Sequence, residues 1–129
     1  MARLIVLDAS VVIAALVADD VHHHAAVDAL AGAGDDELVL AATTRAELLV
    51  GPVRVGGKAM AAARDFVNAC ETVPVSANIA DDAAEMKAQH RNLSLPDAIA
   101  LVIAEVIDAD VVWTFDRRWR DVHQRVAIP

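Results

Sequence analysis

The sequence predicts an α/β fold in which a mostly parallel sheet lies between layers of helices. Short apolar runs rich in Val, Ile and Leu alternate along the chain with longer stretches of helical periodicity. The short runs are continuously apolar, as expected for strands that are buried on both faces. A length of 129 residues suits one domain, residues 1–129, and 57% apolar residues supply its core.

The first predicted elements are a strand and two helices. Residues 4–7 form an apolar run, Leu-Ile-Val-Leu, which indicates a buried strand. Ser10 is a favourable N-cap for a helix over residues 11–18. Residues 21–31 have apolar side chains on one side of a second helix, and the glycines after them predict a turn.

A second strand is predicted over residues 38–41, and two further helices follow it. Thr44 begins the first of these helices. We expect the helix to stop at Gly51 and Pro52, because proline inside a helix removes a hydrogen bond and clashes with the preceding turn. After a glycine-containing bend, residues 58–70 form the next expected helix.

The third strand is expected at an edge of the sheet. It covers residues 72–75, and Pro74 lacks the N–H group that a central strand would need. Helices over residues 78–92 and 97–109 come next, and Pro96 suits the first position of the second one. That helix is apolar nearly all round, which predicts a central position in the fold.

Strands over residues 110–115 and 125–128 complete a sheet of about five strands. In sheets of this kind, ligands bind beyond the carboxyl ends of the strands. Asp8 directly follows the first strand, and Asp116 directly follows the fourth. Alternatively, Asp8 is an acid that favours a helix N-terminus, and Asp116 is a turn-forming residue.

Two further acids, Asp97 and Glu47, are candidates for the same site. Asp97 opens the apolar helix, where it either contributes a carboxylate to a site or complements the helix dipole. Glu47 lies three residues after Thr44, a spacing that also predicts a capping box in which Glu47 returns to the Thr44 amide. The spacing alone favours the cap.

The charge balance argues against general binding of nucleic acids. The formal net charge is −8, whereas such proteins usually present a basic face. The only basic concentration lies near the end of the chain, and we expect Arg117, Arg118 and Arg120 to bind substrate phosphates beside Asp116. The alternative is a solvated face that pairs with nearby acids.

The cellular setting is predicted from two features. The single cysteine, Cys70, excludes an intrachain disulfide and a cysteine-based zinc site. The apolar stretch at residues 11–18 is too short to cross a bilayer, and no leader is recognisable. We therefore expect a cytoplasmic protein with no membrane partner.

Each candidate acid lies in a short motif. In order, the motifs are Leu7-Asp8-Ala9-Ser10, Glu47 within residues 43–49, Leu95-Pro96-Asp97-Ala98 and Thr114-Phe115-Asp116. Together, in this order, they resemble the PIN-domain ribonucleases and, more closely, the VapC toxins of bacterial type II toxin–antitoxin pairs. The resemblance extends over essentially the whole chain.

The resemblance implies a three-layer sandwich with a largely parallel, five-stranded sheet. It also implies an acidic pocket that binds Mg²⁺ or Mn²⁺. The catalytic residues would be Asp8, Glu47, Asp97 and Asp116, the metal ligands Asp8, Asp97 and Asp116, and the supporting residues Ser10 and Thr114. Four carboxylates need cations to share a small site, and hard divalent ions suit oxygen ligands.

The activity implied by the resemblance is cleavage of cellular RNA, of the tRNA or rRNA class. The partners implied are a cognate antitoxin that silences the enzyme and a second copy of the chain in a homodimer. DNA would be bound only indirectly, through the antitoxin.

Two other functions remain open at this point. A receiver-type signalling domain is also a small α/β fold with an acidic Mg²⁺ pocket, but it places adjacent acids after the first strand and a lysine after the last. Here Asp8 stands alone, and the only lysines, Lys58 and Lys87, lie in predicted helices. A catalytically silent PIN scaffold is the second alternative, which the four intact acids disfavour.

Overall fold

The computed structural model describes residues 2–129. The strands are β1 (Leu4–Leu7), β2 (Glu37–Ala41), β3 (Glu71–Val73), β4 (Val111–Trp113) and β5 (Val126–Ala127). The helices are α1 (Ala9–Leu16), α2 (His23–Gly32), α3 (Ala42–Val55), α4 (Gly57–Ala69), α5 (Ala77–Gln89), α6 (Leu95–Val106) and the 3₁₀ helix η1 (Arg117–Asp121). The predicted alternation of strands and helices is confirmed.

The five strands form one sheet in which every pair is parallel, in the order β3-β2-β1-β4-β5. Ile5 of β1 is paired with Leu38 of β2 on one side and with Val111 of β4 on the other. The strand order reverses between β1 and β4, and such a switch point is where ligands bind in open α/β sheets. Flavodoxin-like receivers have the order 2-1-3-4-5, so the receiver alternative is wrong.

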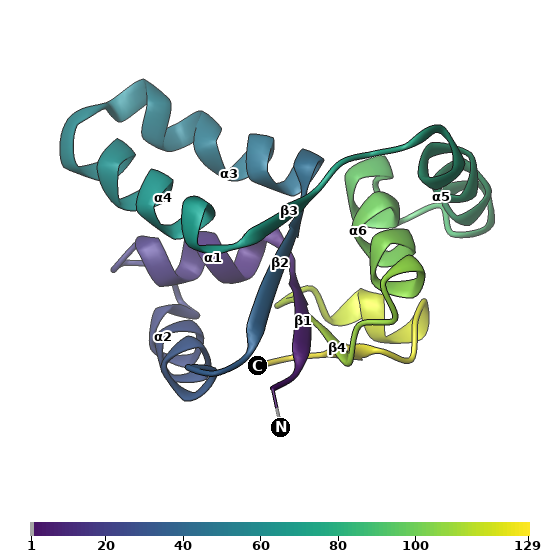
Figure 1. The fold of residues 1–129 in the computed structure, drawn as a ribbon, viewed down its shortest axis with the longest axis horizontal. Coiled ribbons are helices and arrows are strands. Elements are labelled where there is room, and N and C mark those ends of the chain that lie inside the picture. Colours follow the sequence, from purple (N-terminus) through teal and green to yellow (C-terminus); the bar gives the residue numbers. More distant parts are fainter. Residues whose placement is uncertain (1) are drawn as a thin grey trace.

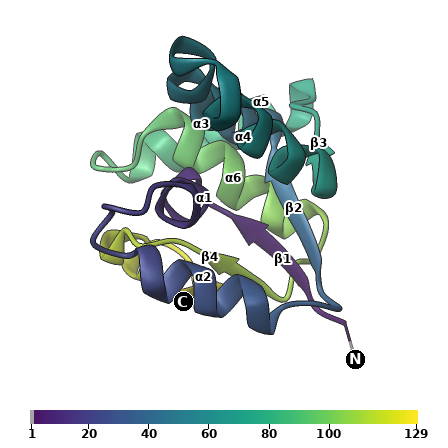
Figure 2. The ribbon, with the colours of Figure 1, turned by 90° about the vertical axis from the view of Figure 1, so that its left-hand side faces the viewer.

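Helices cover both faces of this sheet, as predicted. In Figure 1 the helices α1 to α4 lie on one side of the strands, and α5 and α6 lie on the other. Figure 2 shows β1 running between β2 and β4. Within β1, Ile5 and Leu7 are buried in the core below α1 to α4, while Val6 is buried in the core below α5 and α6. This two-sided burial explains why the strand is continuously apolar.

Helix α6 is the most deeply buried helix, in line with its apolar sequence. Seven consecutive residues, from Ala98 to Ala104, are buried. The helix begins with a capping box, in which Ser94 and Asp97 exchange side-chain hydrogen bonds with each other's backbone N–H groups. Trp119 of η1 packs into the same core and is 2% exposed.

Three details of the helices differ from the sequence prediction. Helix α3 continues through Pro52 to Val55, since only the Pro52 bond is lost and the Pro52 carbonyl still accepts the N–H of Gly56 at 2.8 Å. Helix α3 begins at Ala42, so Thr44 is not its N-cap. Helix α1 begins at Ala9 with Asp8 at the N-cap, which leaves Ser10 inside the first turn.

Among residues 2–129, no helix combines the length and the apolar character that a membrane crossing requires.

Candidate active site

Asp8 lies at the carboxyl end of β1, next to the switch point of the sheet. Its Oδ2 atom accepts two hydrogen bonds, from the Ser10 hydroxyl at 2.7 Å and from the Thr114 hydroxyl at 2.8 Å. Burial raises the pKa of the Asp8 carboxyl, the two hydroxyls oppose this rise, and the charge of Asp97 adds to it. Asp8 is therefore a carboxylate held in place but costly to ionise.

The two hydroxyls connect Asp8 to the end of β4. Thr114 is fully buried, and its Oγ1 atom also accepts the backbone N–H of Asp116 at 3.0 Å. The Ser10 Oγ atom accepts the backbone N–H of Phe115 at 3.1 Å. Ser10 and Thr114, the two predicted supporting residues, thus fix the orientation of Asp8 relative to the chain around Asp116.

Glu47 does not cap its helix, and its carboxyl is influenced by the charges of Asp8 and Asp97. Thr44 lies within α3, and the start of α3 has no side-chain cap, so the capping-box alternative is wrong. Glu47 is exposed over the side chain as a whole, but its carboxyl group is partly shielded from water. This desolvation raises the pKa of the carboxyl. The negative charges of Asp8 and Asp97 raise this pKa further. Asp8, Glu47 and Asp97 are therefore near enough to repel one another.

Asp97 has a structural contact as well as this charged neighbourhood. Its backbone N–H donates to the Ser94 hydroxyl at 3.2 Å, and its Oδ2 accepts the Ser94 N–H at 3.4 Å. Asp97 thus lies in the first turn of α6, as the helix-start alternative predicted. The repulsion that Asp97 exerts on Asp8 and Glu47 shows that its charge also reaches the site.

Asp116 is held by an arginine of its own segment. The Arg118 guanidinium binds it with two hydrogen bonds, from Nε to Oδ1 at 3.0 Å and from Nη2 to Oδ2 at 2.7 Å. Arg118 lowers the pKa of the Asp116 carboxyl below its usual value. All three predicted phosphate-binding arginines are exposed, and within residues 2–129 only Arg118 is paired with an acid.

The donor chemistry of this site fits a hard divalent cation. Mutually repelling carboxylates are stabilised by a cation between them, and oxygen atoms are the ligands that Mg²⁺ and Mn²⁺ prefer. Within residues 2–129, no three His, Cys, Asp or Glu side chains are arranged as a ready-made metal cluster. Arg118 already provides a positive charge at Asp116, so this carboxylate would have to exchange its partner on binding a metal ion.

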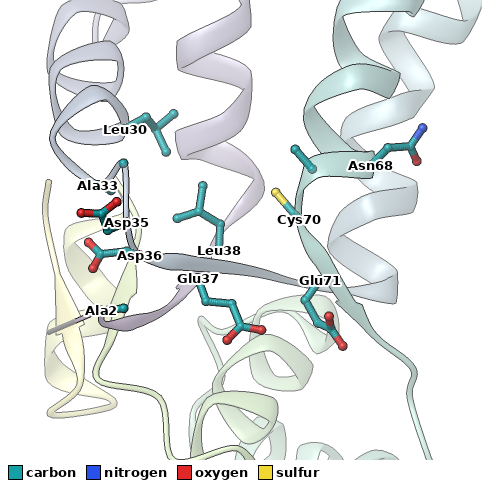
Figure 3. Close-up of a pocket in the computed structure, with 12 residues that line it drawn as sticks. Ala2, Leu30, Ala33, Asp35, Asp36, Glu37, Leu38, Asn68, Cys70 and Glu71 are labelled. Carbon is teal, nitrogen blue, oxygen red and sulfur yellow. The ribbon is translucent and has the colours of Figure 1, made fainter.

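A hollow of about 770 Å³ lies at the end of the sheet opposite to Asp8, where β2 and β3 begin. It is lined by the turn before β2, by the start of β2 and by the junction of α4 with β3. Figure 3 shows that the carboxylates of Asp35, Asp36, Glu37 and Glu71 are spread around this hollow rather than directed at one point. Asp36 is also paired with Arg3 at 3.0 Å. Size alone therefore does not identify the site.

An apolar groove of about 350 Å³ opens beside Glu47. Its walls come from α1, α3 and α4 and include Ile13, Val17 and Val55, which are 39%, 46% and 76% exposed. Exposed apolar side chains gathered in one groove are typical of a surface that packs against a partner.

One aromatic contact beside the site could not be predicted from the sequence. The rings of His22 and Phe115 are stacked, with centroids 4.2 Å apart and an angle of 4° between their planes. His22 therefore packs against the segment that carries Asp116, and no local spacing could reveal a contact between residues so far apart in the chain.

Comparison with known proteins gives a family and a set of similar folds. A family model for the PIN domain matches residues 5–124. No curated protein sequence matches the chain. Among solved structures, Mycobacterium tuberculosis VapC20, described as a sarcin–ricin loop cleaving toxin, is 21% identical with a TM-score of 0.77, over 91% of this chain and 93% of that one.

Two toxin–antitoxin complexes have similar chains. One from Klebsiella pneumoniae is 21% identical with a TM-score of 0.79, over 96% of both chains. A chain of DNA-bound VapBC from Salmonella typhimurium is 16% identical with a TM-score of 0.69, over 100% of this chain and 98% of that one. At these identities the likeness is one of fold.

Proposed function

Because the chain belongs to the PIN-domain family, we propose that it is a metal-dependent endoribonuclease and the toxin of a toxin–antitoxin pair. The observation that carries this proposal is the Asp8 carboxylate, which the Ser10 and Thr114 hydroxyls hold at the switch point of the sheet. A carboxylate held at that place is what a nuclease using divalent cations requires.

We assign the binding of Mg²⁺ or Mn²⁺ to Asp8, Asp97 and Asp116. When bound, such an ion supplies Lewis-acid chemistry at the phosphodiester. Ser10 and Thr114 hold the Asp8 carboxylate in one orientation through hydrogen bonds of 2.7 and 2.8 Å. Fixed orientation matters because a ligand that needs no rearrangement loses less free energy on binding.

Glu47 is the proposed proton acceptor. Its raised pKa moves the carboxylate toward the range in which a general base is effective near neutral pH. It accepts the proton of an attacking water at a carboxylate oxygen, and Arg117, Arg118 and Arg120 hold the phosphates of the RNA. Arg118 would exchange Asp116 for phosphate when the substrate enters.

The proposed substrate is a cellular RNA of the tRNA or rRNA class. In support, one chain of similar fold is described as a toxin that cleaves the sarcin–ricin loop. The proposed partners are a cognate antitoxin and a second copy of the chain, and the apolar groove beside Glu47 offers a surface for the antitoxin. DNA would be contacted only through the antitoxin, and the setting would be the cytoplasm.

The test is cleavage of total RNA by the purified protein, with Mg²⁺ or Mn²⁺ and with EDTA. We expect cleavage that EDTA abolishes, and its loss in Asp8→Asn, Asp97→Asn and Asp116→Asn variants. Expression of the wild type should arrest growth, and each variant should relieve the arrest at equal protein levels. Metal-independent cleavage, or full toxicity of Asp97→Asn, would contradict the assignment.

A further inference from the structure

A small cleft opens beside the acidic site, between η1 and the loop that joins α5 to α6. Its volume is about 200 Å³. The loop contributes His90, Arg91 and Asn92, and η1 contributes Arg118 and Asp121. The cleft is smaller than the roughly 300–1,000 Å³ typical of sites for whole small-molecule ligands, so its size suits a single group such as a phosphate.

The loop is held firmly although its side chains face solvent. Leu93 is buried, and its N–H donates to the His90 carbonyl at 3.0 Å. The Lys87 ammonium donates to the Arg91 carbonyl at 2.9 Å. The Arg91 backbone is therefore fixed, while its guanidinium is exposed and has no ion-pair partner within residues 2–129.

Two arginines line the cleft in a chain whose net charge is −8. Of the charged residues that line it, Arg91 and Arg118 are cationic and Asp121 is anionic, and Arg118 is paired with Asp116. The sequence alone could not reveal that the two arginines share a cleft, because Arg91 comes from the loop and Arg118 from η1. The exposed Arg91 guanidinium is the positive charge that a phosphate needs in order to approach an acidic protein.

The cleft is directly connected to the proposed catalytic acids. Arg118 lines it and binds Asp116 at 2.7 Å, and the charge of Asp97 also reaches Arg118. The loop passes straight into the Ser94–Asp97 capping box. A strand of RNA held at the acids therefore has the cleft as its immediate neighbour.

We propose that this cleft binds a backbone phosphate of the RNA next to the phosphodiester that is cleaved, with Arg91 as its main contact. The inference rests on the function proposed above and adds a binding residue outside the basic run of η1. Arginine suits the role because its planar guanidinium can bind two phosphate oxygens at once. An acidic protein segment is the alternative occupant. RNA is favoured because the cleft is continuous with the acids that would cleave it.

The test compares Arg91→Gln with Arg64→Gln, an equal change of charge at an exposed position on α4, across the sheet from the cleft. Each is placed in an Asp8→Asn background, so that a short fluorescent single-stranded RNA is bound but not cleaved, with Mg²⁺ present. Affinity is measured by anisotropy from about 50 to 200 mM salt. Melting curves verify that each variant is folded.

We expect Arg91→Gln to weaken RNA binding about fivefold to tenfold at low salt and to reduce the slope of log K against log salt by about 0.7, the value for one lost phosphate contact on a single strand. Arg64→Gln should change neither quantity. Arg91→Lys, which keeps the charge, should retain most of the slope.

Three results would overturn the proposal. If Arg91→Gln behaves like Arg64→Gln while the wild type cleaves RNA, the cleft does not bind RNA and the proposed nuclease function stands. If Arg91 supports binding of polyglutamate but not of RNA, the occupant is an acidic protein segment. If the Asp8→Asn protein binds no RNA and the wild type cleaves none, the nuclease function is removed as well.

Discussion

Replacing Thr114 with valine tests whether the hydroxyls that hold Asp8 matter to the folded protein. Valine has nearly the shape of threonine but removes Oγ1, which donates to Asp8 at 2.8 Å and accepts the Asp116 N–H at 3.0 Å. Thr114 is fully buried, so water cannot replace either bond. Thr43→Val is the matched control, because the Thr43 hydroxyl oxygen is buried without any hydrogen-bond partner within residues 2–129.

The expected magnitudes follow from these bonds. A hydrogen bond to a charged group contributes about 1.5–3 kcal/mol, and an orphaned buried N–H costs about 1–3 kcal/mol. Thr114→Val should therefore lower the free energy of unfolding by about 2–4 kcal/mol at neutral pH, and the melting temperature by about 8–15 °C. Thr43→Val should have no cost, or should stabilise slightly, because it removes an unsatisfied polar group.

Urea unfolding of the metal-free protein measures both effects. The midpoints should separate while the slope m stays constant, which shows that stability has changed and not the surface exposed on unfolding. The loss in Thr114→Val should shrink as the pH falls and Asp8 becomes protonated, since the lost bond favours the charged carboxylate. Equal midpoints for the two variants would refute the hydrogen-bond network as a source of stability.

Two further predictions concern charge. Burial and the charges of Asp8 and Asp97 raise the folded pKa of Glu47, so its contribution to stability is complete below the unfolded pKa of about 4.3 and is lost as the pH rises through the folded pKa. In urea unfolding without metal, Glu47→Gln should be more stable than the wild type at pH 7. Its free energy of unfolding should also vary less between pH 4 and 7. A variant less stable than the wild type would contradict the repulsion. Arg118→Gln removes a competing cation from Asp116, so calorimetry should show Mn²⁺ binding about twofold to fivefold tighter, in line with about 0.5–1 kcal/mol for an exposed ion pair; weaker binding would contradict this competition.

The place of the acids could be predicted because it depends on few physical facts. Continuous apolar runs indicate strands buried on both faces, and parallel strands end at a common edge. Asp8 and Thr114 therefore had to meet once β1 and β4 were neighbours, and they do, at 2.8 Å. The resemblance to a known family added Glu47, for which local spacing had favoured a cap.

The side-chain partners could not be predicted, because they depend on contacts between distant segments. The chain shows Arg118 two residues from Asp116, but not that the 3₁₀ turn of η1 directs its guanidinium onto that carboxylate. Helix α3 likewise continues through Pro52 and packs against α4, and the local sequence predicted that it would stop there. The cleft at Arg91 exists only because η1 folds back against the loop between α5 and α6.

Asp97 performs two tasks in this structure, and one pair of variants can separate them. It belongs to the capping box with Ser94, and its charge raises the pKa of both Asp8 and Glu47. Asp97→Asn keeps an amide oxygen that can accept the Ser94 N–H but removes the charge. Ser94→Ala removes the hydroxyl of the cap, at a cost of about 1 kcal/mol, and keeps the charge.

Melting curves in EDTA and in excess Mn²⁺ then give opposite patterns for the two variants. Asp97→Asn should melt at or above the wild type in EDTA, because relief from two like charges outweighs the lost interaction with the helix dipole, and its Mn²⁺ shift should be smaller. Ser94→Ala should melt lower in EDTA and keep the full Mn²⁺ shift. If Asp97→Asn instead follows the pattern of Ser94→Ala, Asp97 is only a helix-start acid and is not a metal ligand.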